Sequence, residues 1–207
     1  PHYGVWPDGY YLTVNQFNQA GTAFTGGGIF AFDRVKMLAG DATASYIYHD
    51  VFADDPNAGG MLPTDFDGLV PPPAGLRNRI MEFRADEFGD PLDAIRTYEL
   101  VPNFSVPASS TFTIRADTPL AAFDARSPSG RTVIEQSGGA GLDAIADRVM
   151  FRVGYRNLGT VTAPQNSWVN NFTVNVSGVN PTTAGTYQTG IRWFELRSTD
   201  STSLGSV

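Results

Sequence analysis

The chain has 207 residues and a formal net charge of −7, with 42% hydrophobic and 17% charged residues. A chain of this length and composition can form one domain with a full core, and it is neither a disordered acidic tail nor a coiled coil. Its 14 basic residues are scattered among 21 acids, and no apolar run is long enough to span a bilayer. We therefore expect neither nucleic-acid binding nor membrane insertion.

Strand-like segments recur along the whole chain. Residues 9–17 read GYYLTVNQF, which is rich in aromatic and β-branched residues, and a triple-glycine turn separates them from a predicted partner strand at 29–32. The further predicted strands are 45–52, 80–84, 95–101, 110–115, 131–136, 149–155, 168–176 and 190–197. Short strands separated by Gly, Pro, Asn and Asp clusters are typical of an all-β protein.

Few segments favour helix. Asp33 is expected to N-cap a short helical turn through Leu38, with Gly40 as its stop. The segment 69–75 reads LVPPPAG and is predicted to be a stiff, extended connector between strands.

The residue inventory limits the chemistry of the chain. It contains no cysteine, which excludes disulfides, thiolate catalysis and cysteine-ligated metal clusters. A Gly-x-Ser-x-Gly nucleophile motif is absent, and the only histidines are His2 and His49. Since no strong catalytic motif is present, a binding role is preferred to an enzymatic one.

Paired carboxylates are the chemical basis of glycoside hydrolysis. The candidates are Asp8, Asp67 and Glu195, because each lies beside aromatic residues or a glycine turn. In the alternative interpretation these acids pair with arginines, such as Arg148 and Arg192.

Aromatic side chains could supply flat faces for a sugar ligand. The candidate ligand-binding residues are Trp6, Tyr10, Tyr11 and Trp193. The alternative is that these rings belong to the core, since a β-protein of this size needs many aromatic residues there.

The Asp65-Phe66-Asp67-Gly68 segment resembles the opening of a calcium-binding loop, with spaced carboxylates and a glycine for the sharp turn. Asp65 and Asp67 are therefore candidate ligands of a structural Ca²⁺, and no other cofactor is indicated. The alternative is an aspartate turn that leads into the proline connector.

Two parts of the chain resemble each other. In each part an acidic residue opens an aromatic strand, and a later aromatic strand contains an acid and an arginine: residues 8–11 lead to 30–34, and residues 147–151 lead to 191–197. This similarity favours two propeller blades in the halves 1–68 and 142–207, or else it reflects ordinary β-sheet repetitiveness.

Five segments resemble a family of large secreted bacterial proteins with β-propeller-like repeats. They are GVWPDGYYLTVNQF (4–17), FAFDRVKMLAGD (30–41), MLPTDFDGLVPPPAG (61–75), AIADRVMFRVGYRNLGT (144–160) and IRWFELR (191–197). The resemblance implies an extracellular or cell-surface setting and further repeats on both sides, so that residues 1–207 form one β-rich region of a longer chain. It implies no catalytic residues.

The predicted fold is all-β and part of a β-propeller, with a β-sandwich as the alternative. The predicted function is an extracellular binding or scaffolding module. The alternatives are a polysaccharide-active enzyme that uses paired carboxylates, and a structural subunit of a surface assembly. The expected partners are the remaining segments of a longer chain or another protein subunit, and a glycan.

Overall fold

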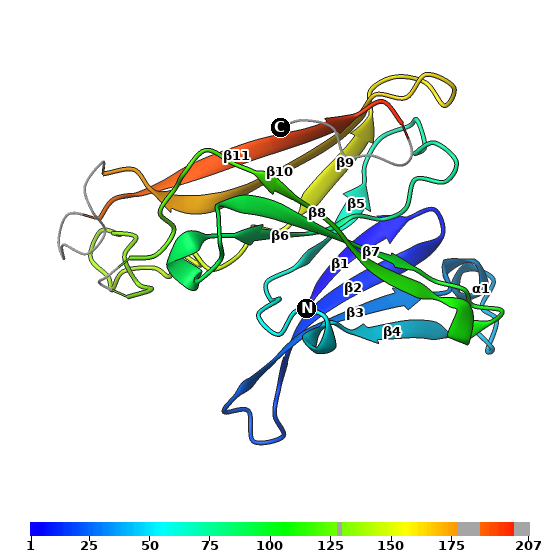
Figure 1. Cartoon of the computed structure of the whole chain (residues 1–207), viewed down its shortest axis with the longest axis horizontal. Coiled ribbons are helices and arrows are strands. Elements are labelled where there is room, and N and C mark those ends of the chain that lie inside the picture. Colours follow the sequence, from blue (N-terminus) through cyan, green and yellow to red (C-terminus); the bar gives the residue numbers. More distant parts are fainter. Residues whose placement is uncertain (128–129, 178–186, 201–207) are drawn as a thin grey trace.

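The computed structural model describes residues 1–127, 130–177 and 187–200, and these form eleven strands in two sheets (Figure 1). One of the two sheets is curled into a half-barrel. The prediction of an all-β protein is confirmed.

The small sheet contains the first four strands in chain order and is antiparallel throughout. Its strands are β1 (His2–Trp6), β2 (Gly9–Phe17), β3 (Phe24–Phe32) and β4 (Tyr46–Asp50). The short helix α1 (Arg34–Leu38) follows β3, and the Asp33 side chain accepts a hydrogen bond from the Lys36 N–H at 3.1 Å. This contact confirms Asp33 as the predicted N-cap.

The large sheet has the strand order β11-β10-β9-β5-β6-β7-β8. Its strands are β5 (Leu62–Phe66), β6 (Ile80–Arg84), β7 (Ala94–Val101), β8 (Thr111–Pro119), β9 (Val153–Asn157), β10 (Asn166–Asn175) and β11 (Thr189–Ser198). The pairing of β5 with β9 is parallel and joins two antiparallel meanders into one sheet. Connecting segments contain the 3-10 helices η1 (Val51–Ala53), η2 (Asp86–Phe88) and η3 (Pro107–Ser109).

The two sheets pack against each other, and their backbones approach closely where β1 passes β5. A Cβ atom on Gly4 would lie 2.5 Å from the carbonyl oxygen of Thr64, so only glycine fits this position without a shift. A second contact between the sheets joins β4 to β8, because the His49 ring stacks on Phe112 with a centroid distance of 3.9 Å. These contacts hold the small sheet against the β5–β8 part of the large one.

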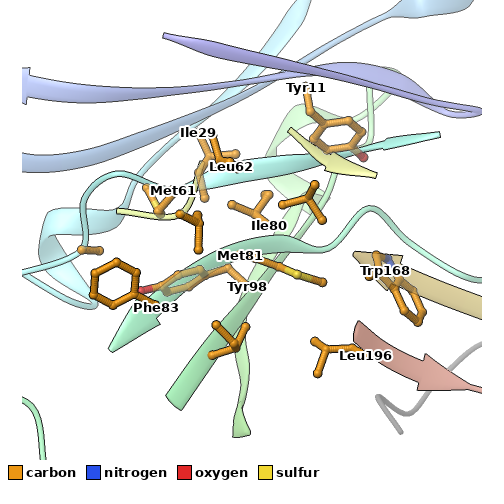
Figure 2. Packing of buried hydrophobic residues seen from close by; sticks show 14 of the residues in the cluster. Tyr11, Ile29, Met61, Leu62, Ile80, Met81, Phe83, Tyr98, Trp168 and Leu196 are labelled. Carbon is orange, nitrogen blue, oxygen red and sulfur yellow. The ribbon is translucent and has the colours of Figure 1, made fainter. Parts of the chain in front are cut away.

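The core lies between the sheets (Figure 2). It includes Tyr11 and Ile29 from the small sheet and Leu62, Ile80 and Tyr98 from the large sheet, all with 0% exposure. Along β2 the buried residues alternate with half-buried ones, as expected when one face of a strand is turned inward. Full burial of a large apolar side chain contributes about 1.5–3 kcal/mol, so this cluster is the main source of stability.

One predicted strand is absent from the described residues, two observed strands were not predicted, and the predicted strand 149–155 begins only at Val153. Residues 131–136 do not form a strand and show a single bridge between Ile134 and Leu142, because no neighbouring strand continues the pairing. The strands β1 and β5 were not predicted: Gly4 interrupts the first pattern and Pro63 the second, and a proline normally argues against a central strand. The 69–75 connector contains neither helix nor strand and leads from β5 toward β6.

Aromatic side chains gather on the outer face of the small sheet, on the side away from the core. The Phe30 ring lies 4.7 Å from that of Tyr48 and 5.8 Å from that of Tyr46, and Phe32 lies 6.0 Å from Tyr46. Tyr46 and Tyr48 are exposed. Since a solvent-facing sheet surface is normally polar, this aromatic outer face is a candidate contact surface.

The close approach of β1 to β5 predicts the effect of Gly4→Ala. The new methyl group would push the Thr64 carbonyl away, so we expect the free energy of unfolding in urea to fall by about 1–3 kcal/mol. Gly154→Ala is the matched control, because Gly154 also lies in a strand and nothing is within 4 Å of its added Cβ. An equal loss of stability in the two variants would contradict the close approach.

Candidate functional site

The described residues contain three neighbouring hollows that share wall residues, and together they are called the groove. The middle hollow has a volume of about 410 Å³ and is walled by the β2–β3 hairpin, the loop before β5, β6, η2 and the segment before β9. A second hollow, of about 290 Å³, shares four wall residues with the middle one: Asn15, Phe17, Gly60 and Arg148. A third hollow, of about 510 Å³, shares Phe88 and Asp147 with it. The middle hollow therefore shares wall residues with both of the others.

Exposed aromatic rings line the groove. Phe17 and Phe24 are register partners in the β2–β3 hairpin, and their ring centroids lie 5.9 Å apart. Phe88, in η2, lies 6.2 Å from Phe83 of β6. Phe17, Phe24 and Phe88 are 57%, 41% and 45% exposed, so they offer surface for stacking.

Glu82 lies in the wall of the middle hollow and is only 6% exposed. It belongs to β6, which is buried along its whole length. The Tyr98 hydroxyl donates a hydrogen bond to Glu82 Oε2 at 2.7 Å, and Arg84 Nη1 donates to Oε1 at 3.2 Å. Both carboxyl oxygens are thereby held in fixed directions.

Burial raises the pKa of Glu82 to about 7. The hydrogen bond from Tyr98 and the charge of Arg84 oppose this rise, and the nearby charge of Asp55 adds to it. Desolvation outweighs the favourable partners because the ionised carboxylate loses its hydration on all sides. Near neutral pH, Glu82 is therefore present in both protonation states.

Below Glu82 lies a buried network of charges centred on Asp55. Asp55 Oδ2 accepts hydrogen bonds from Arg84 Nη1 at 2.8 Å, from Arg96 Nη1 at 2.7 Å and from the Tyr98 hydroxyl at 3.2 Å. Arg96 also forms a two-pronged pair with Asp117, with both contacts at 2.6 Å. Each buried charge here has an opposite partner, as buried ions require.

Two further carboxylates lie in the groove wall. Asp90 Oδ1 lies 2.5 Å from Arg84 Nη2, and its Oδ2 accepts a hydrogen bond from the Ala85 N–H at 3.0 Å. Asp147 pairs with Arg148 and with Arg131 at 2.9 and 2.7 Å. Burial alone would raise the pKa of Asp147, but the two arginines outweigh it and lower that pKa to about 2. The groove thus combines a carboxyl group that can carry a proton with one that stays ionised.

The carboxylates predicted from the sequence lie elsewhere and apart from one another. Each is paired with an arginine: Asp8 with Arg77 at 3.3 Å, Asp67 with Arg152 at 2.9 Å, and Glu195 with Arg197 at 2.8 Å. Hydrogen bonds from these arginines hold the pKa values of Asp67 and Glu195 below their usual range. None of the three acids lines the groove, and their catalytic role stays a prediction.

The arginine partners also differ from those suggested by the sequence. Arg148 pairs with Asp147 instead of Asp8. Arg192 donates to the carbonyl oxygens of Ala121 and Ala122 and lies over the Phe123 ring instead of pairing with Glu195. Arg148 thus pairs with its neighbour in the sequence, whereas the partners of Arg192 are brought near it by the fold.

The predicted ligand-binding rings divide into two groups. Trp6 and Tyr11 are 1% and 0% exposed and lie in the core, where the Trp6 indole N–H donates to the Leu76 carbonyl at 3.1 Å. Trp193 is exposed on β11, and Tyr10 is half-buried with the Arg34 guanidinium 5.7 Å from its ring centre. Protein atoms cover the faces of the first two rings, so only Tyr10 and Trp193 are accessible to a ligand.

The candidate calcium ligands are occupied by protein groups. Asp65 accepts a hydrogen bond from the Val5 N–H at 3.0 Å and pairs with Arg152, whose other nitrogen contacts Asp67 at 2.9 Å. Arg156 lies 3.4 Å from Asp67. A bound Ca²⁺ would have to replace these arginines, and calcium binding at this position stays a prediction.

Another acidic cluster lies near the groove. The carboxylates of Asp86, Glu87 and Asp93 each offer an oxygen within 4.8 Å of the others. Backbone N–H groups already use these acids: Asp93 accepts from Asp86 and Phe123, and Glu87 accepts from Ala125. The cluster therefore fixes the η2 loop that carries Phe88.

The sequence analysis missed Glu82 and Asp90. The available signal was a pair of charges, Glu82 and Arg84, within the otherwise apolar strand IMEFR. An acid inside a strand that is buried on both faces needs a partner, and it is often functional. The choice of Asp8, Asp67 and Glu195 relied on nearby aromatic residues or glycine turns, and neither feature indicates whether an acid is buried.

No protein-family model, curated protein or solved structure matches this chain. Within the described ranges, none of the helices is long and apolar enough to cross a membrane.

The raised pKa of Glu82 predicts how stability depends on pH. Between about pH 4.5 and 7 the unfolded chain releases this proton while the folded chain retains it, so stability falls as the pH rises through this window. We expect a loss on the order of 3 kcal/mol in the wild type from this group. Glu82→Gln should remove this contribution in urea unfolding measured from pH 4 to 8.

The exposed Glu135 provides the control for this measurement. Glu135→Gln should keep the pH dependence of the wild type. Identical pH dependence in the wild type and Glu82→Gln would mean that Glu82 does not titrate in this range.

Proposed function

We propose that this chain is an extracellular or cell-surface module that binds a linear polysaccharide in the groove. The proposal is supported by one observation: exposed aromatic rings and hydrogen-bonding side chains line the three neighbouring hollows of the groove. Three neighbouring hollows favour a chain of several sugar units over a single small ligand.

The chemistry of the groove suits a sugar chain. A pyranose ring has apolar C–H faces that pack on aromatic rings, and Phe17, Phe24 and Phe88 offer such rings. Its hydroxyl groups need both donors and acceptors, and the Asn15 and Asn57 amides in the wall supply both. Arginines and carboxylates of the wall add charged donors and acceptors.

The same proposal covers the cellular location of the protein and the choice between a β-propeller and a β-sandwich. We infer that the module is part of a longer secreted bacterial protein, with the remaining chain or another subunit as its partner. The sequence resemblance supports this setting. The antiparallel order β1-β2-β3-β4 has the form of a propeller blade, which supports the propeller, whereas the packing of one sheet against the other supports the sandwich alternative.

Loss of the groove rings should weaken polysaccharide binding. Phe17→Ala and Phe24→Ala each remove a stacking surface, and we expect a loss of about tenfold in affinity per ring. Soluble β-glucan, xylan, polygalacturonate and dextran are suitable ligands for native affinity electrophoresis, followed by calorimetry with the one bound most tightly.

Trp193→Ala is the matched control, because this ring is exposed on β11 outside the groove. It should bind as the wild type does. If Trp193→Ala weakens binding and the two Phe variants do not, the binding site is on β11 and the groove proposal is wrong. A wild type that binds none of the four polysaccharides would overturn the proposed function.

The structural-subunit alternative is supported by the aromatic outer face of the small sheet. If this face joins copies of the chain, sedimentation velocity should show association that increases with concentration. The double variant Tyr46→Ser/Tyr48→Ser should then be monomeric, since it removes the two exposed tyrosines. A wild type that stays monomeric at every concentration would argue against self-assembly through this face.

A further inference from the structure

We propose that the middle hollow also hydrolyses the glycosidic bond of the polysaccharide it binds, with Glu82 as the proton donor and Asp90 as the carboxylate that activates water. This inference rests on the proposed polysaccharide-binding function and adds a reaction to it. Glu82 and Asp90 line the same hollow, and the guanidinium of Arg84 joins them.

Glu82 has the surroundings of a proton donor. It lies in the groove wall yet is nearly excluded from solvent, and its two oxygens are oriented by Tyr98 and Arg84. Burial raises its pKa to about 7, so the carboxyl group carries a proton in weakly acidic solution. A general acid works best when its pKa lies near the working pH.

Arg84 separates the two carboxyl groups. Its Nη1 lies 3.2 Å from Glu82 Oε1 and its Nη2 lies 2.5 Å from Asp90 Oδ1. Because a guanidinium lies between them, the two carboxyl groups are not in direct contact with each other. The roles proposed here, with direct attack by water, are those of hydrolysis with inversion of configuration, which uses carboxyl groups about 6.5–9.5 Å apart.

The reaction then needs water as its only co-reactant. Glu82 donates its proton to the glycosidic oxygen while the bond from that oxygen to the anomeric carbon breaks. A water molecule adds its oxygen to the anomeric carbon and passes one proton to Asp90. Release of that proton to solvent and uptake of another by Glu82 restore the starting state.

The buried network beneath the hollow holds this pair in place. Asp55, Arg96 and Tyr98 belong to the network but do not line the hollow, whereas Glu82 and Asp90 do. Asp55, Arg96 and Tyr98 are therefore positioning residues.

The test uses whichever of the four named polysaccharides the wild type binds most tightly. We expect the wild type to release new reducing ends from it at about pH 5.5, below the pKa of Glu82. Glu82→Gln and Asp90→Asn should each lose about 100-fold or more in rate while still binding the polysaccharide. Glu135→Gln, on an exposed residue outside the groove, should keep full activity.

The pH profile separates a catalytic Glu82 from a structural one. The hydrogen bond from Tyr98 lowers the pKa of Glu82. Tyr98→Phe should therefore keep Glu82 protonated to higher pH and move the alkaline limb of the activity profile upward. Circular dichroism and thermal unfolding show whether Glu82→Gln folds. If it does not, Tyr98→Phe and Asp90→Asn still test the proposal.

The possible results are distinct. A wild type that binds the polysaccharide but releases no reducing ends overturns the hydrolytic inference and leaves the binding proposal intact. Full activity in Glu82→Gln, or a product with retained configuration by proton NMR, overturns the assigned roles. If the wild type binds none of the four polysaccharides, both proposals fail.

Discussion

The buried charges around Asp55 constrain the rest of the structure. A single carboxylate oxygen receives hydrogen bonds from Arg84, Arg96 and Tyr98, which come from β6 and β7, while Asp55 itself comes from the loop before β5. A buried ion that loses its partner costs about 3–5 kcal/mol, so these segments must keep their positions together. The Tyr98 ring lies in the aliphatic and aromatic core while its hydroxyl group contacts the network, so the two are in direct contact.

The same network connects the core to the groove through one side chain. Arg84 contacts Asp55 on the core side and Asp90 in the groove wall, and it also contacts Glu82. The position and charge of the groove carboxyl groups therefore depend on interactions made inside the protein. Burial raises the pKa of Glu82 and the charge of Arg84 opposes this rise, so the protonation of this carboxyl group near neutral pH reflects both effects.

Local patterns predicted the strand content better than the site. Enrichment in aromatic and β-branched residues identified β2, and a capping aspartate identified the start of α1. The same reasoning chose Asp8, Asp67 and Glu195 by their proximity to turns, but arginines that lie near them in the fold hold all three. Arg197 lies on the same strand as Glu195, but the partners of Asp8 and Asp67 are distant in the sequence, and a single sequence does not reveal which segments are adjacent.

The sequence by itself determined that the chain forms short antiparallel strands around an aromatic-rich core, because strand propensity and two-residue alternation act over a few neighbouring residues. The tertiary structure decided which strands pair, which residues line the groove and how deeply Glu82 is buried. The parallel pairing of β5 with β9 joins residues 64–66 to 153–155, and the groove draws on segments from residue 15 to residue 148. Burial of Glu82 follows from that assembly. Desolvation depends on everything packed around the carboxyl group, so its pKa is a property of the fold and not of the strand that carries it.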